Sequence, residues 1–130
     1  MEATNKTHDF REDETVVKTQ DMFPNYGKYK MKTIFICHPW RGNIIYPSRT
    51  KKICRDMALN TNDTPLSTGL FINQFLDDDK ELEREIGINL GLRLLKMCDE
   101  VYVYEQYGIS EGMAIELKMA KKLGIPVIKK

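Results

Sequence analysis

The sequence predicts an α/β protein with a parallel sheet of about four to five strands and helices on both faces. Two observations favour this class. Short apolar runs typical of buried strands, at 33–37 and 100–104, alternate along the chain with segments of helical periodicity. The segment 110–123 follows one such strand, stops at Gly124 and leads into a last apolar run at 126–128. This order joins strands that lie parallel.

Composition limits the classes of partner. The chain has 130 residues, of which 42% are hydrophobic and 30% charged, as in an ordinary globular protein with a modest core. The formal net charge of +1 gives no basic field for a nucleic-acid polymer. No apolar run is long enough to span a bilayer, and the N-terminus has no secretory apolar region. We therefore expect a cytoplasmic protein with no membrane partner and no nucleic-acid polymer as partner.

The three cysteines, Cys37, Cys54 and Cys98, form no CxxC pair and lack metal-ligand spacing. Each lies among apolar residues, so we interpret them as small core residues in a reducing compartment. No metal site and no cofactor are expected.

Two regions differ in composition. Residues 1–30 are rich in Thr, Asp, Glu, Lys and Asn, and we expect a polar arm that is disordered, forms a short helix or contacts a neighbouring subunit. The compact domain is expected at 31–130. Its expected elements are a strand at 33–37, a helix at 48–60, a short strand and then a loop within 65–75, a helix at 77–97, a strand at 100–104, a helix at 110–123 and a strand at 126–128.

Ligands of such sheets bind at the carboxyl ends of the strands, which selects the loops after 37, after about 66 and after 104. The first loop holds His38, Trp40, Arg41, Gly42 and Asn43. Arg41 is a fixed cation suited to phosphate or carboxylate, and Gly42 permits close approach of the backbone. Trp40 either stacks on a base or seals the loop onto the core, and His38 either donates to a ligand or caps the strand end.

The second loop ends in Ser110, a good helix N-cap. The backbone N–H groups that follow it form an anion site, so Ser110 and Gly112 are candidate phosphate ligands. The alternative is plain capping with no ligand. Glu111 lies in the first helical turn, where the helix dipole favours an acid, and it is either a site residue or a surface acid.

Glu116 is the most informative residue of the chain. Apolar positions recur at 109, 113, 117, 120 and 123, the spacing of a buried helical face, and Glu116 lies on that same face. A carboxylate on a buried stripe costs desolvation energy unless it is paired or has a task. It is therefore either a buried ion pair, an acid at the edge of the stripe, or a site residue. Asp99, just before a strand, is either a turn residue or a second acid near the site.

The run Asp77–Asp79 resembles a metal cluster, but consecutive acids at a helix start point in different directions, so we interpret it as a solvated N-terminus. The lysines at 121, 122, 129 and 130 are interpreted as a solvated face. No catalytic Ser/His or Cys/His arrangement is visible.

Three segments together resemble the nucleoside 2-deoxyribosyltransferase-like superfamily, which includes 2′-deoxynucleoside 5′-phosphate N-hydrolases. The resemblance spans 31–130. It rests on an opening strand followed by His38-Pro39-Trp40-Arg41-Gly42, on the turn Cys98-Asp99-Glu100-Val101, and on Ser110-x-Gly112-x-x-x-Glu116-Leu117-x-x-Ala120. It implies a flavodoxin-like sheet, a nucleoside or nucleotide as small-molecule partner, and a homo-oligomer with sites near the subunit interface.

The resemblance also implies roles for single residues. Glu116 would be the nucleophile that attacks the anomeric carbon of the sugar, and Asp99 the supporting acid. Ser110 and Gly112 would line the phosphate or hydroxyl pocket, and Arg41 and Gly42 would match the ligand contacts of the first loop. We therefore expect an N-glycosidase or deoxyribosyltransferase. The alternative is a non-catalytic protein that sequesters an ADP-ribose-like or cyclic nucleotide signal, and a third option is a structural domain with a vestigial pocket.

Overall fold

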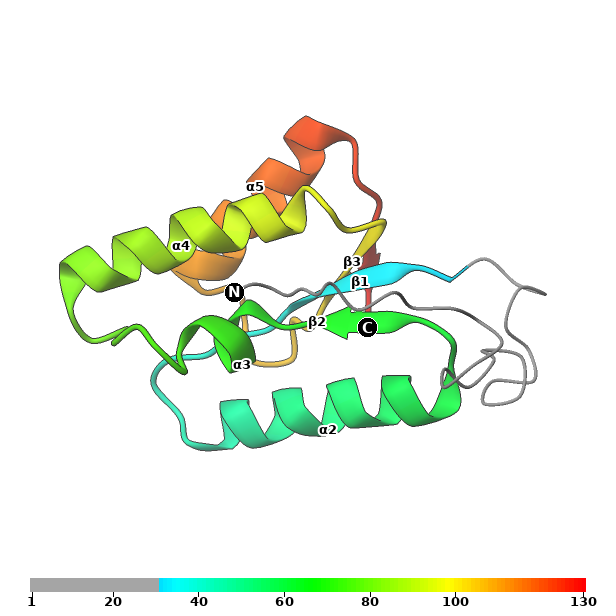
Figure 1. Cartoon of the computed structure of the whole chain (residues 1–130), viewed down its shortest axis with the longest axis horizontal. Helices are drawn as coiled ribbons and strands as arrows, with labels where there is room; N and C mark the ends of the chain where they lie inside the picture. The colour runs from blue at the N-terminus through cyan, green and yellow to red at the C-terminus, as the bar shows by residue number, and fades with distance from the viewer. Residues whose placement is uncertain (1–30) are drawn as a thin grey trace, which may run out of the picture. The chain divides into compact units, whose positions relative to one another are not determined.

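Strands and helices alternate along residues 31–130, the part of the chain that the computed structural model describes (Figure 1). The expected arm at 1–30 lies outside the described residues. The elements are β1 (Thr33–Cys37), α2 (Ile45–Asn60), β2 (Thr64–Leu66), α3 (Thr68–Ile72), α4 (Glu81–Leu95), β3 (Glu100–Val103), α5 (Glu111–Leu123) and β4 (Val127–Lys129).

The four strands form one parallel sheet in the order β2-β1-β3-β4, so the predicted fold class is confirmed. β1 is central and pairs Phe35 with Leu66 of β2 on one side and with Val101 of β3 on the other. Val101 in turn pairs with Val127 of β4. Because all four strands run the same way, their carboxyl ends meet at one edge of the sheet, where the loops after β1, β2 and β3 lie together.

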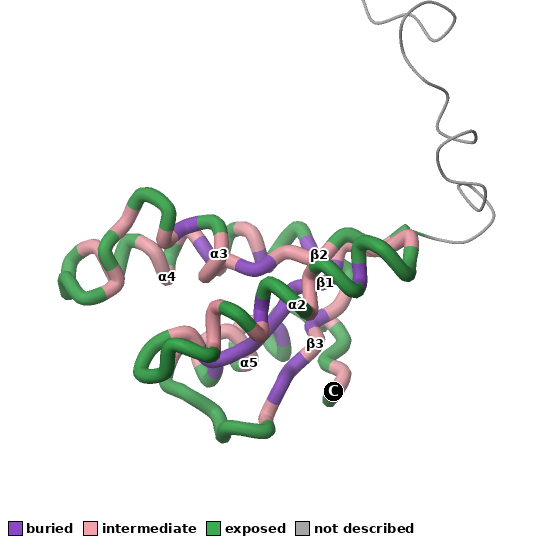
Figure 2. The backbone as a smooth tube through the Cα atoms, turned by 90° about the horizontal axis from the view of Figure 1, so that it is seen from below, coloured by how far each residue is buried: buried purple, intermediate pink, exposed green. Residues whose placement is uncertain are grey.

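Each face of the sheet carries its own core, because side chains alternate along a strand. Phe35 and Val101 point to the face covered by α4 and α5, where they pack with Leu95, Met113 and Ala120. Ile34 and Ile36 point to the other face and pack with Met57 of α2, together with Tyr104. Figure 1 shows α2 on one side of the sheet and α4 and α5 on the other, and Figure 2 shows buried residues along β1 and β3.

The largest differences from the sequence prediction are the earlier start of α2, the presence of α3 and the later start of α4. Helix α2 begins at Ile45 rather than at 48, because the Asn43 side chain accepts a hydrogen bond from the Ile45 N–H at 3.0 Å. Pro47 falls in its first turn, where a missing N–H costs nothing. The expected loop within 65–75 contains the short helix α3, which begins where the Ser67 hydroxyl accepts from the Leu70 N–H at 3.2 Å.

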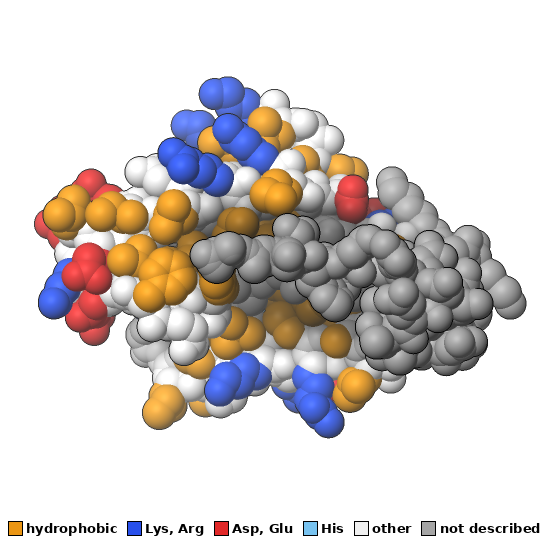
Figure 3. Space-filling view, viewed as in Figure 1, with side chains coloured by type: hydrophobic (Ala, Val, Ile, Leu, Met, Phe, Trp, Pro, Cys, Tyr) orange, Lys and Arg blue, Asp and Glu red, His pale blue; other side chains and the backbone are white. Residues whose placement is uncertain are grey.

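Helix α4 begins at Glu81, four residues later than expected. The Asp77 carboxylate accepts the N–H of Asp79 at 3.0 Å, and the Asp77 N–H donates to the Glu83 carboxylate at 2.8 Å. The acidic run therefore forms a turn ahead of the helix instead of its first turn. Acidic side chains gather at this end of the molecule, and basic side chains lie over α5 and along α2 (Figure 3). None of the described helices is both long and apolar enough to cross a bilayer.

Candidate functional site

A cavity of about 310 Å³ lies at the carboxyl edge of the sheet. Its walls come from the loop after β1, the turn between β2 and α3, the inner side of α4 and the first turns of α5. Its volume is at the lower end of those that hold small organic ligands. Of the sequence-predicted site residues, those that line it are His38, Trp40, Arg41, Ser110, Glu111, Gly112 and Glu116.

The start of α5 forms one wall of the cavity. Ser110 has an extended backbone, and its hydroxyl accepts the N–H of Met113 at 3.2 Å, which confirms the predicted N-cap. A side chain added at Gly112 would meet no atom within 4 Å, so the backbone here is open. The first N–H groups of a helix have no partner within the helix. Together with the helix dipole, these groups make the wall favourable for a negatively charged ligand.

Glu116 lies one turn further along α5 and is partly buried at the cavity wall. No ion pair among the described residues involves Glu116. The two arginines on the cavity pair with other acids, Arg41 with Asp78 and Arg84 with Glu111. Burial raises the pKa of Glu116 to about 7, and the nearby Cys37 thiol opposes part of that rise. Arg41 does not pair with this carboxylate, because it pairs with Asp78.

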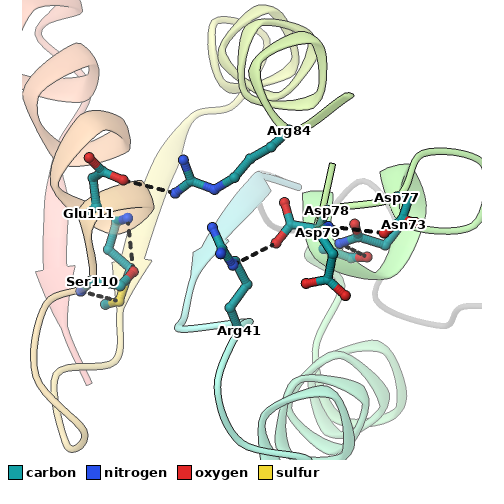
Figure 4. Close-up of polar contacts among 10 residues, drawn as sticks. Arg41, Asn73, Asp77, Asp78, Asp79, Arg84, Ser110 and Glu111 are labelled. Atoms are coloured by element: carbon teal, nitrogen blue, oxygen red, sulfur yellow. Dashed lines mark hydrogen bonds and ion pairs between the residues drawn. The ribbon is translucent and has the colours of Figure 1, made fainter. Parts of the chain in front are cut away.

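Two arginines converge on the cavity from different elements (Figure 4). The Arg41 Nε lies 3.5 Å from an Asp78 carboxylate oxygen, and an Arg84 guanidinium nitrogen lies 3.1 Å from the Glu111 carboxylate. Each guanidinium has five N–H donors, and the single contact to its acid leaves donors available. Because partly exposed ion pairs are weak, a ligand oxyanion is able to replace either acid at small cost. The arrangement suits binding of a phosphoryl group.

His38 is held as a neutral ring. Its Nδ1 lies 2.8 Å from the Pro39 carbonyl oxygen, and its Nε2 accepts the Arg49 Nε–H at 3.4 Å, so Nδ1 carries the proton. Burial is the main reason that the pKa of His38 lies below its ordinary value. The rings of Tyr46, Tyr104 and Tyr107 surround it at centroid distances of 5.8, 5.8 and 6.4 Å. His38 is therefore a fixed part of the cavity wall, and its neutral ring carries the proton on Nδ1.

Trp40 packs closely against Gly69 in α3. A Cβ added at Gly69 would lie 2.3 Å from the indole ring, far inside the closest contact that real atoms make. Glycine at this position is therefore required for the ring to occupy its place on the cavity wall. The sequence left open whether Trp40 contacts a ligand or seals the loop, and the structure gives it both a packing role and a face on the cavity.

We expect Gly69→Ala to displace the Trp40 ring and to lower the free energy of unfolding by about 1–3 kcal/mol. Trp40 is the only tryptophan, so its fluorescence reports this displacement directly. Gly87→Ala in α4 is the matched control, because its added carbon would meet the Ile72 and Leu76 side chains at 3.3 and 3.7 Å and not the indole ring. Chemical denaturation should show a smaller loss for the control, with unchanged emission. Equal emission in both variants would contradict the assigned packing.

Three predicted site residues are not on the cavity. Gly42, at a positive φ of 92°, borders an adjoining open depression with Asp77–Asp79, and Asn43 is used to start α2. Asp99 precedes β3 and therefore lies at the opposite edge of the sheet, where its carboxylate accepts the Thr33 N–H at 2.8 Å. The alternative of a second acid near the site is corrected: Asp99 is a turn residue that joins two strands, and we do not carry it into the site.

The sequence analysis missed Arg84, Thr68 and Asn73 as cavity residues. Thr68 and Asn73 belong to a segment expected as a loop. Arg84 falls within the helix expected at 77–97. It lies three residues after Glu81, the first residue of α4, and a cation in the first turn of a helix opposes the helix dipole, which marks Arg84 as unusual. Within residues 31–130, no three His, Cys, Asp or Glu side chains are grouped to hold a metal ion.

The fold and the cavity define an α/β protein with a ligand-sized cavity at the carboxyl edge of a parallel sheet. The family described as a domain of unknown function (DUF7768) matches residues 32–130, and the chain belongs to that family. No curated protein matches the chain.

Among solved structures, the chain is similar to a 2-deoxyribosyltransferase from the psychrotolerant bacterium Bacillus psychrosaccharolyticus. The two are 19% identical, with a TM-score of 0.59, over 75% of this chain and 70% of the other. This confirms a nucleoside deoxyribosyltransferase-like fold, as the resemblance in the sequence implied.

Proposed function

We propose that this protein cleaves the bond between base and sugar of a nucleoside or nucleotide, as an N-glycosidase or deoxyribosyltransferase with Glu116 as nucleophile. The observation that carries this proposal is the side chain of Glu116, which borders a ligand-sized cavity at the carboxyl edge of the sheet and has no cationic partner among residues 31–130. A partly buried acid with no cation beside it has the properties of a catalytic group.

In the proposed reaction, a Glu116 carboxylate oxygen forms a bond to the anomeric carbon of the sugar. The bond from that carbon to the base nitrogen breaks, and its electron pair leaves with the base, which takes up a proton from solvent. Water or a second base then attacks the same carbon and frees the carboxylate. The transition state carries positive charge on the sugar, and a nearby carboxylate in an apolar wall stabilises that charge.

A pKa near 7 means that about half of Glu116 is ionised at neutral pH, and only that half is nucleophilic. The rate should therefore rise with pH through this range. The apolar surroundings that raise the pKa also strengthen the interaction with the developing positive charge.

The proposal is tested by incubating the purified chain with 2′-deoxynucleosides and their 5′-phosphates, with and without a second base, and separating the products by chromatography. Release of free base without an acceptor indicates hydrolysis, and a new nucleoside indicates transfer. The absence of both with every substrate would refute the proposal. Tight retention of an added nucleotide through gel filtration without turnover would favour the sequestering alternative.

Arg84 and Arg41 are expected to select phosphorylated ligands. Their guanidinium groups line the cavity beside the start of α5, and each is held by one exchangeable acid. Arg84→Ala should weaken binding of a nucleoside 5′-phosphate about ten- to a hundred-fold and binding of the free nucleoside much less. Arg93→Ala is the control, an exposed arginine of α4 that is not on the cavity. Equal losses for both ligands in calorimetry would contradict a role in phosphate binding.

A further inference from the structure

Asn73 lies on the cavity wall, but the proposed reaction gives it no role. It directly follows Ile72, the last residue of α3, and it is partly buried. The same residue also borders the adjoining open depression, so it lies where the cavity and the depression meet. Trp40 borders both hollows in the same way. These two residues therefore form one end of the space that is open to a ligand.

A hydrogen bond fixes the orientation of the Asn73 amide. Its Nδ2 lies 3.1 Å from the carbonyl oxygen of Gly69, one turn earlier in the chain. A carbonyl oxygen only accepts, so the amide nitrogen must be on that side. Within residues 31–130 this is the only hydrogen bond that the side chain makes. The Oδ1 atom and one amide N–H are therefore available to a ligand.

Gly69 also brings the Trp40 ring to the same place. A Cβ at Gly69 would collide with the indole, so the ring rests on the helix at the residue whose carbonyl oxygen holds Asn73. A flat aromatic surface beside a polar amide is an arrangement that binds a nucleobase. The ring stacks on the face of the base, and the amide forms hydrogen bonds with its edge.

The base is expected at this end of the cavity because the other end suits the phosphate. Figure 4 shows Asn73 and the start of α5 on opposite sides of the two arginines. The N-cap Ser110 and the first N–H groups of α5, with Arg84 beside them, favour an anion. A nucleoside 5′-phosphate carries its base and its phosphate on opposite ends of the sugar. A phosphate at the start of α5 therefore directs the base toward α3.

Acceptors outnumber donors at the Asn73 end of the cavity. The Oδ1 atom of Asn73 has two lone pairs, against one remaining amide N–H. Asp77, Asp78 and Asp79 border the adjoining depression, and Arg41 pairs with only one of these acids, Asp78. An exocyclic amino group presents two N–H donors, one for Oδ1 and one for the acidic side. A carbonyl oxygen in the same place would be repelled by the carboxylates.

We propose that Trp40 and Asn73 bind the base of the ligand and select a base with an exocyclic amino group, as in adenine or cytosine. The proposal rests on the proposed function for the ligand class, a nucleoside or nucleotide, but binding does not require the base to be released. Trp40 supplies stacking that all bases share, and the Oδ1 atom of Asn73 supplies the choice among them.

The experiment measures, by titration calorimetry, the binding of two pairs of carbocyclic 2′-deoxynucleoside 5′-phosphates, in which a methylene replaces the ring oxygen and the bond to the base is not cleaved. One pair carries adenine and the other cytosine, and each compares the natural base with one that has hydrogen in place of the amino group. Quenching of the fluorescence of Trp40, the only tryptophan, reports stacking of the base.

The proteins compared are wild type, Asn73→Ala, Asn73→Asp and the control Gln74→Ala, each checked for folding by denaturation. Gln74 is a matched control because its Nε2 donates to the Leu70 carbonyl oxygen at 3.2 Å, the same kind of bond one residue along, and it is not on the cavity. Asn73→Asp keeps an acceptor oxygen but loses the donor to Gly69, so it separates base recognition from a structural role of the amide.

Wild type is expected to bind the amino-bearing member of at least one pair about tenfold more tightly than the other member. Asn73→Ala should bind both members equally, whereas Asn73→Asp and Gln74→Ala should keep the preference. The proposal is overturned by absence of binding or of a preference in wild type, by an unchanged preference in Asn73→Ala, or by its loss in Asn73→Asp. Binding with the expected preference but without base release from natural nucleotides refutes the proposed function alone.

Discussion

Replacing Glu116 by Gln is expected to lower the rate of base release at least about a thousand-fold, because an amide cannot form the covalent bond to the sugar. Gln keeps the size and shape of the side chain and one acceptor oxygen. The affinity for a non-hydrolysable nucleoside 5′-phosphate analogue should therefore stay within about threefold of the wild-type value. Initial rates and titration calorimetry on the same preparations measure the two quantities separately.

Glu85→Gln is the matched control for this change. Glu85 is an exposed acid of α4 that does not border the cavity, so its variant should release base at the wild-type rate. Substantial base release by Glu116→Gln would assign the nucleophile to another group. A parallel loss of ligand affinity would show that the amide disturbs binding and not only the chemical step.

The same substitution is expected to stabilise the domain at alkaline pH. Glu116 has a pKa of about 7 in the folded chain against an ordinary value of 4.5, so the folded state binds the proton more tightly than the unfolded state. The contribution of this group to stability is therefore fully present below pH 4.5 and is lost as pH rises through 7. The shift corresponds to a loss of about 3 kcal/mol, since one pKa unit equals about 1.4 kcal/mol.

Denaturant unfolding of wild type and Glu116→Gln from pH 4 to 8.5 measures this effect. The two proteins should be nearly equal in stability at the acid end, and the Gln variant should be more stable by about 3 kcal/mol at the alkaline end. His38, with its pKa below the ordinary value, contributes an opposite slope below about pH 6.5, but that slope is common to both proteins and cancels in the difference. If the two free energies of unfolding differ by the same amount at every pH, the raised pKa assigned to Glu116 is contradicted.

Local sequence pattern was sufficient to place helix boundaries that are marked by a capping residue or a terminating glycine. Helix α5 begins after Ser110 and ends at Gly124, which has the positive φ of 73° that a helix-terminating glycine takes. Capping chemistry and glycine conformation act within a few residues, so they are readable without a fold. The beginnings of α2 and α4 could not be predicted in this way, because the side chains of Asn43 and Asp77 form turns that compete with the simple helix signals.

The sequence alone determined the order of strands and helices, the parallel sheet, and the place of Glu116 on the inner stripe of α5. It did so because apolar periodicity fixes which face of an element is buried. Only the tertiary structure decided that Arg84 meets Glu111, that Arg41 meets Asp78, and that Asp99 is at the far edge of the sheet. Periodicity assigns a residue to a face of its own helix or strand, whereas pairing and ionisation depend on which other element that face meets.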